Sequence, residues 1–348
     1  MNQPLISVVT PFHNTAPYLA ECIESVLQQS YHNYEYILVD NCSSDDSPSI
    51  AESYARRDSR IRFIRRSNLL SQVQNYNAAL EEISIESEYC KIVQADDCIF
   101  PECLQSMVQA FGQSETIGLV GSYWLKGDAV RGSGFPHYAT WLSGRELASL
   151  YLRSGIYMFG SPTTVMYRSS VVRNETPFFD ETLLHEDTEK CMQLLERWDF
   201  GFVPQILSFL RLENESISFS VRSLLPQILD WYMITQRYAP VFLERSEASA
   251  IQKSSKQEYY KALAHQALRF RKDIFWQYHK MGLRSLGQTL DWPYLAGQVA
   301  MELFWKVANP GATVRNVVDR LSRASDTQKK IDSIDCLRKP SSNGIKVK

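Results

Sequence analysis

The sequence lacks the features that mark several common classes of protein. Its 348 residues contain no glycine-rich loop that ends in Lys-Ser or Lys-Thr, and no glycine fingerprint follows the first apolar segment. A P-loop and a dinucleotide-binding turn are therefore excluded. No apolar stretch reaches the roughly 20 residues that cross a bilayer, and no secretory signal pattern begins the sequence. We therefore expect a cytoplasmic protein.

The sequence has no excess of acidic or basic residues, and it contains few cysteines. The 37 lysines and arginines nearly balance 39 acidic residues, for a net charge of −2, so the basic field that holds nucleic acid is absent. The seven cysteines form no CxxC pair, and no histidine stands at a metal-ligand spacing, which argues against a disulfide scaffold and a structural zinc. With 44% hydrophobic residues the chain can bury a core, and we expect free thiols.

What the sequence does contain is a regular alternation of short apolar segments and amphipathic helical patterns. The continuous apolar segments are typical of a mostly parallel sheet that is covered on both faces. The predicted fold class is therefore α/β: a single Rossmann-like, mostly parallel sheet with helices on both faces, plus a C-terminal helical appendage. The strands are predicted at residues 5–10, 34–39, 61–64, 89–93, 117–123, 163–167 and 200–210, with helices at 16–28, 46–55, 73–80, 101–111, 144–152 and from 185–187 to 198.

The later part of the chain is less regular. A glycine-rich stretch over 127–136 predicts a mobile loop. We expect a first domain, a helical C-terminal region and a disordered tail that is rich in basic residues. Their predicted bounds are 1–220 (with halves at about 1–122 and 123–220), 221–337 and 338–348.

Three predicted strands end in short polar and acidic residues. These are TPFHN at 10–14, DNCSSDD at 40–46 and QADD at 94–97. In an open parallel sheet, ligands bind beyond the carboxyl ends of the strands, beside a topological switch point. A diphosphate bound there would need its charge neutralised, and a Mg²⁺ or Mn²⁺ ion held by a carboxylate is the obvious means.

These segments resemble the nucleotide-sugar half of a family-two glycosyltransferase. The resemblance rests on SVVTPFHN at 7–14, VDNCSSD at 39–45 and QADDCIFP at 94–101, followed in the expected order by GSP at 160–162, FD at 179–180 and HED at 185–187. It covers about residues 4–218 and implies the A-type glycosyltransferase fold. It also implies metal-assisted, inverting transfer of a sugar from a nucleotide-diphosphate donor, in particular a UDP-sugar, to a hydroxyl acceptor in cell-surface polysaccharide or lipid-linked glycan synthesis.

The resemblance implies roles for the matching positions. Asp97 matches the carboxylate that coordinates Mn²⁺ or Mg²⁺, and Asp187 matches the general base. The residues implied in substrate binding are Pro11 and Asn14 in the loop around the nucleotide, Asp40 at the nucleotide base, Asn75, Asp96 near the ribose and diphosphate, Glu186 in the acceptor half, and Arg211 at the diphosphate. The chain departs from the family pattern in residues 68–75, which lack the usual glycine and arginine, at Gln94, where another acid is common, and at Glu213, where many relatives have histidine.

Plainer interpretations of the same residues stay open. Residues 40–46 are also typical of a turn and helix-cap cluster, Asp96 and Asp97 of a cap for the next helix, and Glu186 and Asp187 of ordinary first-turn acids. Two other functions also remain: a sugar nucleotidyltransferase, whose Gly-rich basic loop is absent, and a non-catalytic subunit that binds nucleotide sugar or glycan.

Residues 292–309 predict a helix with a wide apolar face that must pack on something. Glu302 and Lys306 have the favourable orientation for an ion pair. The face is buried within the appendage or in a homodimer, or it lies on the inner face of the cell membrane beside the basic tail, close to a lipid-linked acceptor. The expected partners are thus a nucleotide-sugar donor and a glycan or lipid-linked acceptor, and not nucleic acid.

Overall fold

The computed structural model describes residues 3–137, 139–181, 186–212, 222–269 and 271–309. The strands are β1 (Ile6–Phe12), β2 (Tyr34–Asp40), β3 (Ile61–Arg65), β4 (Tyr89–Ile92), β5 (Cys98–Ile99), β6 (Ile117–Lys126), β7 (Ala129–Arg131), β8 (Trp141–Leu142), β9 (Met166–Arg168) and β10 (Asp199–Leu210). They form one ten-stranded sheet in the order β3-β2-β1-β4-β9-β6-β10-β5, with β7 beside β6 and β8 beside β10.

Most strands of this sheet run in the same direction. β1 pairs in parallel with β2 and β4, β2 with β3, and β6 with β10, whereas β9 is antiparallel to both β4 and β6. Because two antiparallel pairings restore the direction, β6 and β10 run parallel to β4. The predicted α/β fold with a mostly parallel sheet is confirmed. The strand order reverses between β1 and β4, which makes the carboxyl ends of these two strands the expected ligand site.

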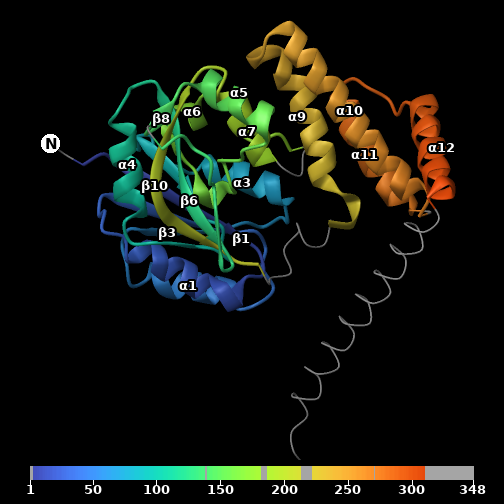
Figure 1. Ribbon diagram of the computed structural model, residues 1–348. Helices are drawn as coiled ribbons and strands as arrows, with labels where there is room; N and C mark the ends of the chain where they lie inside the picture. The colour runs from blue at the N-terminus through green and yellow to red at the C-terminus, as the bar shows by residue number, and fades with distance from the viewer. Residues whose placement is uncertain (1–2, 138, 182–185, 213–221, 270, 310–348) are drawn as a thin grey trace, which may run out of the picture. The chain divides into compact units, whose positions relative to one another are not determined.

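Helices cover both faces of the sheet because each presents an apolar side to it. One buried cluster joins a face of the sheet to α1, α2 and α4 through Ile23, Ala51 and Leu104. The other cluster joins the opposite face to α3 and α5 through Leu80 and Leu147. Figure 1 shows α1 on one side of the strands and α5 and α7 on the other. The helices are α1 (Ala16–Leu27), α2 (Ser47–Ala55), α3 (Gln72–Leu80), α4 (Cys103–Phe111), α5 (Gly144–Ser154), α6 (Ser169–Arg173), α7 (Glu186–Leu194), α9 (Pro226–Phe242), α10 (Arg245–Ala267), α11 (Asp273–Ser285) and α12 (Trp292–Ala308), with short 3₁₀ turns η1 (Pro162–Thr164) and η2 (Arg222–Leu224).

The glycine-rich stretch 127–136, predicted as a mobile loop, begins with a β-hairpin. β6 and β7 pair antiparallel as far as Lys126 and Ala129, so only Gly127 and Asp128 form the turn. Gly127 has φ +61°, a left-handed conformation that glycine adopts without steric cost. The loop prediction was wrong for β7, because β6 continues three residues past its predicted end and offers β7 a partner.

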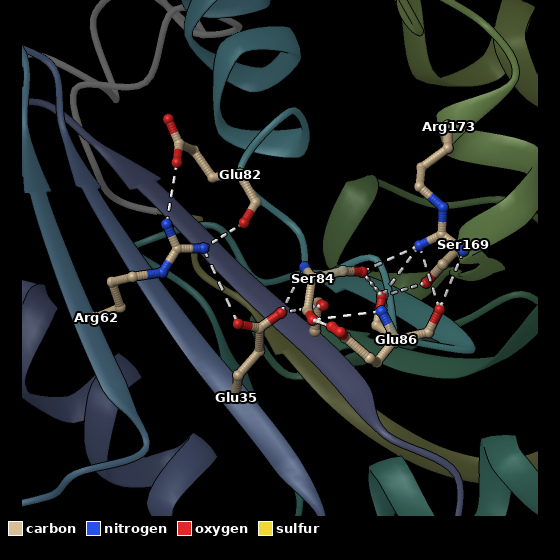
Figure 2. A network of polar contacts seen from close by, with 9 residues as sticks. Glu35, Arg62, Glu82, Ser84, Glu86, Ser169 and Arg173 are labelled. Atoms are coloured by element: carbon tan, nitrogen blue, oxygen red, sulfur yellow. Dashed lines mark hydrogen bonds and ion pairs between the residues drawn. The ribbon is translucent and has the colours of Figure 1, made fainter.

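A network of polar contacts fixes the connection between α3 and β4 (Figure 2). Glu35 on β2 accepts a hydrogen bond from the backbone N–H of Ser84 at 2.7 Å, and Arg62 on β3 forms a 3.0 Å ion pair with Glu82. Arg173 on α6 donates to the Ser84 carbonyl oxygen at 3.1 Å. Glu35 and Arg62 lie near the amino ends of their strands, so these contacts hold the C-terminal end of α3 at that edge of the sheet. The N-terminal turn of α3 is thereby held toward the opposite, carboxyl edge.

The chain divides into two compact units, each of which has its own internal contacts. The predicted domain boundaries at residues 220 and 337 lie outside the described residues, and the predicted division near residue 122 falls within β6. The division into domains therefore stays a prediction. Unit 1 consists of residues 1–259 and 273–289, and unit 2 of residues 260–272 and 290–348.

Unit 2 contains the end of α10 and all of α12. Glu302 Oε1 lies 2.9 Å from Lys306 Nζ, which confirms the predicted ion pair, and 2.7 Å from His265 Nδ1 of α10. The Tyr260 hydroxyl accepts a hydrogen bond from the backbone N–H of Asp291 at 2.9 Å. Across the parts of the chain that the structure describes, no helix combines the length and apolarity needed to cross a membrane.

Candidate active site

The carboxyl ends of β1 and β2 meet in a polar turn. The backbone N–H of Asn14 donates to Ser43 Oγ at 2.9 Å, and the backbone N–H of Ser44 donates to Asn14 Oδ1 at 2.8 Å. Asp40 Oδ1 in turn accepts a hydrogen bond from the Ser43 N–H at 2.9 Å. The structure therefore brings Asn14 and Asp40 together through Ser43. These bonds also confirm that the segment forms a turn.

The second oxygen of Asp40 has a different environment. Asp40 is fully buried, and its Oδ2 has no hydrogen-bond partner among the described residues, although Arg65 Nε lies 3.3 Å away. A buried polar atom without a partner costs about 1–3 kcal/mol. The Asp40 Oδ2 atom is thus an acceptor that a ligand with an N–H group can satisfy.

The acidic pair beyond β4 is also buried. Asp97 Oδ2 accepts a hydrogen bond from the Thr163 hydroxyl at 2.6 Å, and Asp97 Oδ1 accepts one from the backbone N–H of Arg211 at 3.3 Å. Burial, followed by the neighbouring charge of Asp96, raises the pKa of the Asp97 carboxyl above its usual range. The interpretation of this pair as a cap for the next helix is wrong, because α4 is preceded directly by Glu102.

Arg211 lies beside this acidic pair, although it is 114 residues from Asp97 in the sequence. Its Nε donates to the Asp96 carbonyl oxygen at 3.1 Å, and its Nη2 donates to Glu21 Oε2 at 2.7 Å. The guanidinium carbon lies 4.9 Å from the centre of the Tyr18 ring, which is cation–π distance. Arg211 therefore supplies a fixed positive charge next to the two carboxylates.

Tyr76 on α3 lies near acids of both halves of the site, and no sequence pattern predicted its position there. Its hydroxyl accepts hydrogen bonds from Gln94 Nε2 at 2.8 Å and from Gln72 Nε2 at 2.7 Å. Burial and then the charge of Glu186 raise the pKa of Tyr76 well above its usual value, and Asp96 adds to this shift. Since both acids act on one hydroxyl, Glu186 and Asp96 both lie near it.

Asp187 lies in the first turn of α7, as predicted. Its Oδ1 accepts a hydrogen bond from the Thr188 N–H at 2.7 Å, and the Thr188 hydroxyl lies 2.7 Å from the hydroxyl of Tyr157. Burial and then the charge of Asp187 raise the pKa of Tyr157 well above its usual range. Carboxylates in the first turn of a helix are stabilised by the helix dipole, which suits Asp187 to the ionised state that a base requires.

Of two further predicted substrate-binding residues, Pro11 lies differently from expectation, whereas Asn75 lies in the predicted helix. Pro11 belongs to β1, where it is buried and pairs with Val39, so it is not in the following loop. Asn75 lies inside α3, and its Oδ1 is buried without a hydrogen-bond partner in the described part of the chain. Glu213 and the predicted His185 lie outside the described residues.

The residues present fit a divalent cation that arrives with a nucleotide. Within the described ranges, no group of three or more His, Cys, Asp or Glu side chains is arranged to hold a metal ion. However, Mg²⁺ bound with phosphate needs only one or two carboxylates, because phosphate oxygens and waters complete its shell. Each oxygen of Asp97 accepts one hydrogen bond from the described residues, from Thr163 or from Arg211, and keeps a second lone pair. The buried negative charge of Asp96 and Asp97 favours a cation there.

Comparison with known proteins matches this part of the chain to one family. The model described as "Glycosyl transferase family 2" matches residues 7–175. Residues 7–175 are a family-two glycosyltransferase domain. The acids at 40 and 96–97, together with Thr163, lie within this family-two domain, whereas Asp187 and Arg211 follow it.

Curated relatives agree with this assignment over part of their length. Glycosyltransferase GlyG of Streptococcus pneumoniae serotype 4 is 34% identical over 120 residues, which are 34% of this chain and 39% of that protein. The uncharacterized glycosyltransferase EpsJ of Bacillus subtilis is 33% identical over 129 residues, which are 37% of this chain and 36% of that protein. The aligned stretch thus spans less than two fifths of the length of these relatives.

Solved structures extend the likeness of the fold beyond the family-two domain. The crystal structure of S. aureus TarS 1–349 in complex with UDP-GlcNAc has a TM-score of 0.57 and 17% sequence identity, and covers 81% of this chain and 80% of that chain. At this identity the likeness concerns the fold alone. The predicted A-type glycosyltransferase fold is confirmed.

Proposed function

We propose that the protein is a glycosyltransferase that moves a sugar from a nucleotide-diphosphate sugar, in particular a UDP-sugar, to a hydroxyl group of a glycan or lipid-linked acceptor. One observation carries the proposal. Thr163 bonds to Asp97, the acid assigned to the metal, and Tyr157, six residues away in the same segment, bonds to Thr188, the neighbour of Asp187, the acid assigned to the acceptor. The proposed role is in cell-surface polysaccharide or lipid-linked glycan synthesis.

On the donor side, three groups account for nucleotide binding. Asp40 Oδ2 offers an acceptor to the imide N–H of a uracil ring. Asp97, beside Asp96, would hold Mn²⁺ or Mg²⁺, which neutralises charge on a departing diphosphate. Arg211 supplies positive charge next to the same acids. Asn14 and Asn75 complete the polar lining in this proposal.

On the acceptor side, Asp187 takes the proton of the attacking hydroxyl group. Proton removal by a positioned base contributes about 10²- to 10⁴-fold to the rate of such a step. Glu186, which is buried beside it, assists in binding the acceptor. Direct displacement by the hydroxyl oxygen breaks the bond between the anomeric carbon and the diphosphate on the opposite face. The product therefore has the inverted anomeric configuration, which NMR of the product reports, and a retained configuration would refute the single displacement.

The test is release of UDP from a panel of UDP-sugars in the presence of Mn²⁺. We expect Asp187→Asn to lower turnover about 100-fold or more and to leave UDP binding unchanged. Asp273→Asn is a matched control, since Asp273 is an exposed acid in the first turn of α11. Full turnover by Asp187→Asn would contradict the proposal. UDP binding without any UDP release would favour a non-catalytic binding subunit, and release of a nucleoside monophosphate or pyrophosphate would favour a sugar nucleotidyltransferase.

We also propose that unit 2 contacts an anionic membrane surface. α12 presents an exposed face with no charged side chain, which includes Trp292, Met301, Leu303, Phe304 and Val307. Unit 2 contains 14 lysines and arginines against 6 acids, whereas the rest of the chain contains 23 against 33. An apolar helix face within a basic region binds anionic lipid through buried apolar area and electrostatic attraction together. A homodimer through the same face is the alternative.

A further inference from the structure

Residues 157–164, here called the bridging segment, connect the two halves of the candidate site. At one end, the Tyr157 hydroxyl lies 2.6 Å from the Gly160 carbonyl oxygen and 2.7 Å from Thr188 Oγ1, next to Asp187. At the other end, the Thr163 hydroxyl donates to Asp97 Oδ2 at 2.6 Å. A single short segment therefore contacts both the acid assigned to the donor and the neighbour of the acid assigned to the acceptor.

The directions of these hydrogen bonds follow from the atoms involved. The Gly160 carbonyl can only accept, so the Tyr157 hydroxyl donates its one proton there and accepts a hydrogen bond from Thr188 at 2.7 Å. The Thr188 hydroxyl also lies 3.3 Å from Asp187 Oδ1, a second and longer acceptor for the same proton. Thr163 Oγ1 accepts from the backbone N–H of Gln94 at 3.0 Å, which leaves its own proton for the Asp97 carboxylate. The protons of Tyr157 and Thr163 are thus each used once, and the proton of Thr188 is shared between Tyr157 and Asp187.

The bridging segment is also anchored from within the core. Lys91 on β4 is fully buried, and its ammonium group donates to the Thr163 carbonyl oxygen at 2.7 Å. Gly160 has φ +70°, and a Cβ atom there would lie 2.3 Å from Thr164 Oγ1. Only glycine fits this turn without displacing Thr164. The segment therefore has little freedom to move relative to β4.

We propose that the bridging segment fixes Asp97 and Asp187 relative to each other, with Thr163 and Tyr157 as positioning residues. This inference rests on the proposed glycosyltransferase function. It assigns Thr163 to the donor side of the site and Tyr157 to the acceptor side. Thr163 orients Asp97 for the metal and diphosphate. Tyr157, through Thr188, orients the first turn of α7 and thereby Asp187. The two residues consequently affect different steps.

The expected effects separate binding from turnover. A hydrogen bond to a charged group contributes about 1.5–3 kcal/mol, so Thr163→Val should weaken Mn²⁺-dependent binding of UDP about ten- to hundredfold. It should leave the weaker binding of UDP without metal unchanged. Tyr157→Phe should leave both Kd values unchanged and lower the kcat of sugar transfer about tenfold. Thr188→Val should repeat the effect of Tyr157→Phe.

The experiment is calorimetry with UDP, with and without Mn²⁺, together with kinetics of UDP release from the donor that proves active. Thr163→Ser keeps the hydroxyl and should restore metal-dependent binding, which a packing role for Thr163 would not produce. Thr235→Val and Tyr34→Phe are matched controls. Each removes a buried hydroxyl that is bonded away from the site, to Ser255 Oγ at 2.7 Å and to the Val26 carbonyl at 3.1 Å.

The outcomes distinguish this inference from the proposed function. If Asp97→Asn abolishes metal-dependent binding while Thr163→Val and Tyr157→Phe behave as wild type, the function stands and the positioning role is overturned. If Asp97→Asn itself binds UDP and Mn²⁺ normally, the proposed function is contradicted, whatever the Thr163 and Tyr157 variants show. Equal losses of binding and turnover in Thr163→Val, Thr163→Ser and the controls would show a general loss of stability and would also overturn the inference.

Discussion

Asp40 uses its two oxygens differently, one for the fold and one for a ligand. Oδ1 holds the turn through the N–H of Ser43, and Oδ2 is buried without a hydrogen bond in the part of the chain that the structure describes. Folding alone leaves this atom incompletely satisfied, because it loses its bonds to water and gains only an ion-pair contact with Arg65 Nε at 3.3 Å among the described residues. The arrangement is explained if an N–H group of the bound nucleotide donates a hydrogen bond to Asp40 Oδ2.

Asp40→Asn tests this role at a single position. The amide keeps the size of the side chain and one oxygen for the Ser43 N–H, but it replaces the second acceptor with a donor. We expect UDP to bind about ten- to hundredfold more weakly, since an unpaired buried donor costs about 1–3 kcal/mol. Calorimetry measures this. Asp46→Asn is the control, because Asp46 is exposed and its side chain forms no cap hydrogen bond. Wild-type affinity in Asp40→Asn would contradict the assignment.

At the scale of helices and strands, the local periodicity predicted most of the sheet. The ends of β1 to β4 differ from the predicted ends by at most two residues, because buried strands and amphipathic helices leave clear patterns. The two-residue strands β5 and β8 were not predicted, since their formation depends on pairing with β10, which lies more than 50 residues away. Such pairing leaves no local pattern.

The candidate site could be predicted only where a residue type suggests its own chemistry. Acids at strand ends indicated Asp97 and Asp40, and the resemblance to the family-two glycosyltransferases indicated Asp187. Tyr76 and Thr163 were missed, because a tyrosine or threonine in an apolar segment is typical of a core. Their roles depend on contacts with Gln94 and Asp97 that span 18 and 66 residues of sequence.

α11 provides a test of how the helical elements respond to pH. His279 is buried: its Nε2–H donates to the Leu224 carbonyl oxygen at 3.0 Å, and its Nδ1 lies 3.1 Å from the Tyr259 hydroxyl. Burial lowers the pKa of His279 from 6.5 to about 4. Between these values the unfolded chain binds a proton and the folded chain does not. Stability contributed by neutral His279 is therefore present above pH 6.5 and is lost as pH falls toward 4.

His279→Gln should remove this pH dependence. We expect the free energy of unfolding of the wild type to fall by about 2 kcal/mol more than that of the variant between pH 7 and pH 5. Denaturant titrations at the two pH values measure the difference, and the comparison cancels contributions from other groups. An identical loss in the two proteins would show that His279 is protonated in the fold.

At the scale of the whole molecule, charge is divided unequally along the chain. Unit 2 is basic and the remainder is acidic, although the total net charge is only −2. The exposed residues of α12 add an apolar surface to the basic unit. This combination is what the proposed membrane contact requires.

Co-sedimentation with vesicles tests the membrane contact. We expect the protein to bind vesicles of phosphatidylcholine with phosphatidylglycerol more strongly than phosphatidylcholine alone, and binding to fall in the double variant Phe304→Ser, Val307→Ser, whose side chains are 76% and 78% exposed. Ile274→Ser, at an exposed apolar position of α11, is the control. Undiminished binding by the double variant would contradict the proposal. A dimer in lipid-free solution that the double variant abolishes would assign the face to a second copy.

The most direct measurement is a crystal structure of the protein with UDP and Mn²⁺. The account predicts uracil against Asp40, and the metal in contact with an Asp97 oxygen at about 2.0–2.3 Å and with the diphosphate. Asp187 should face the donor from across the bridging segment. Metal coordinated without Asp97, or UDP bound away from the ends of β1 and β4, would contradict it.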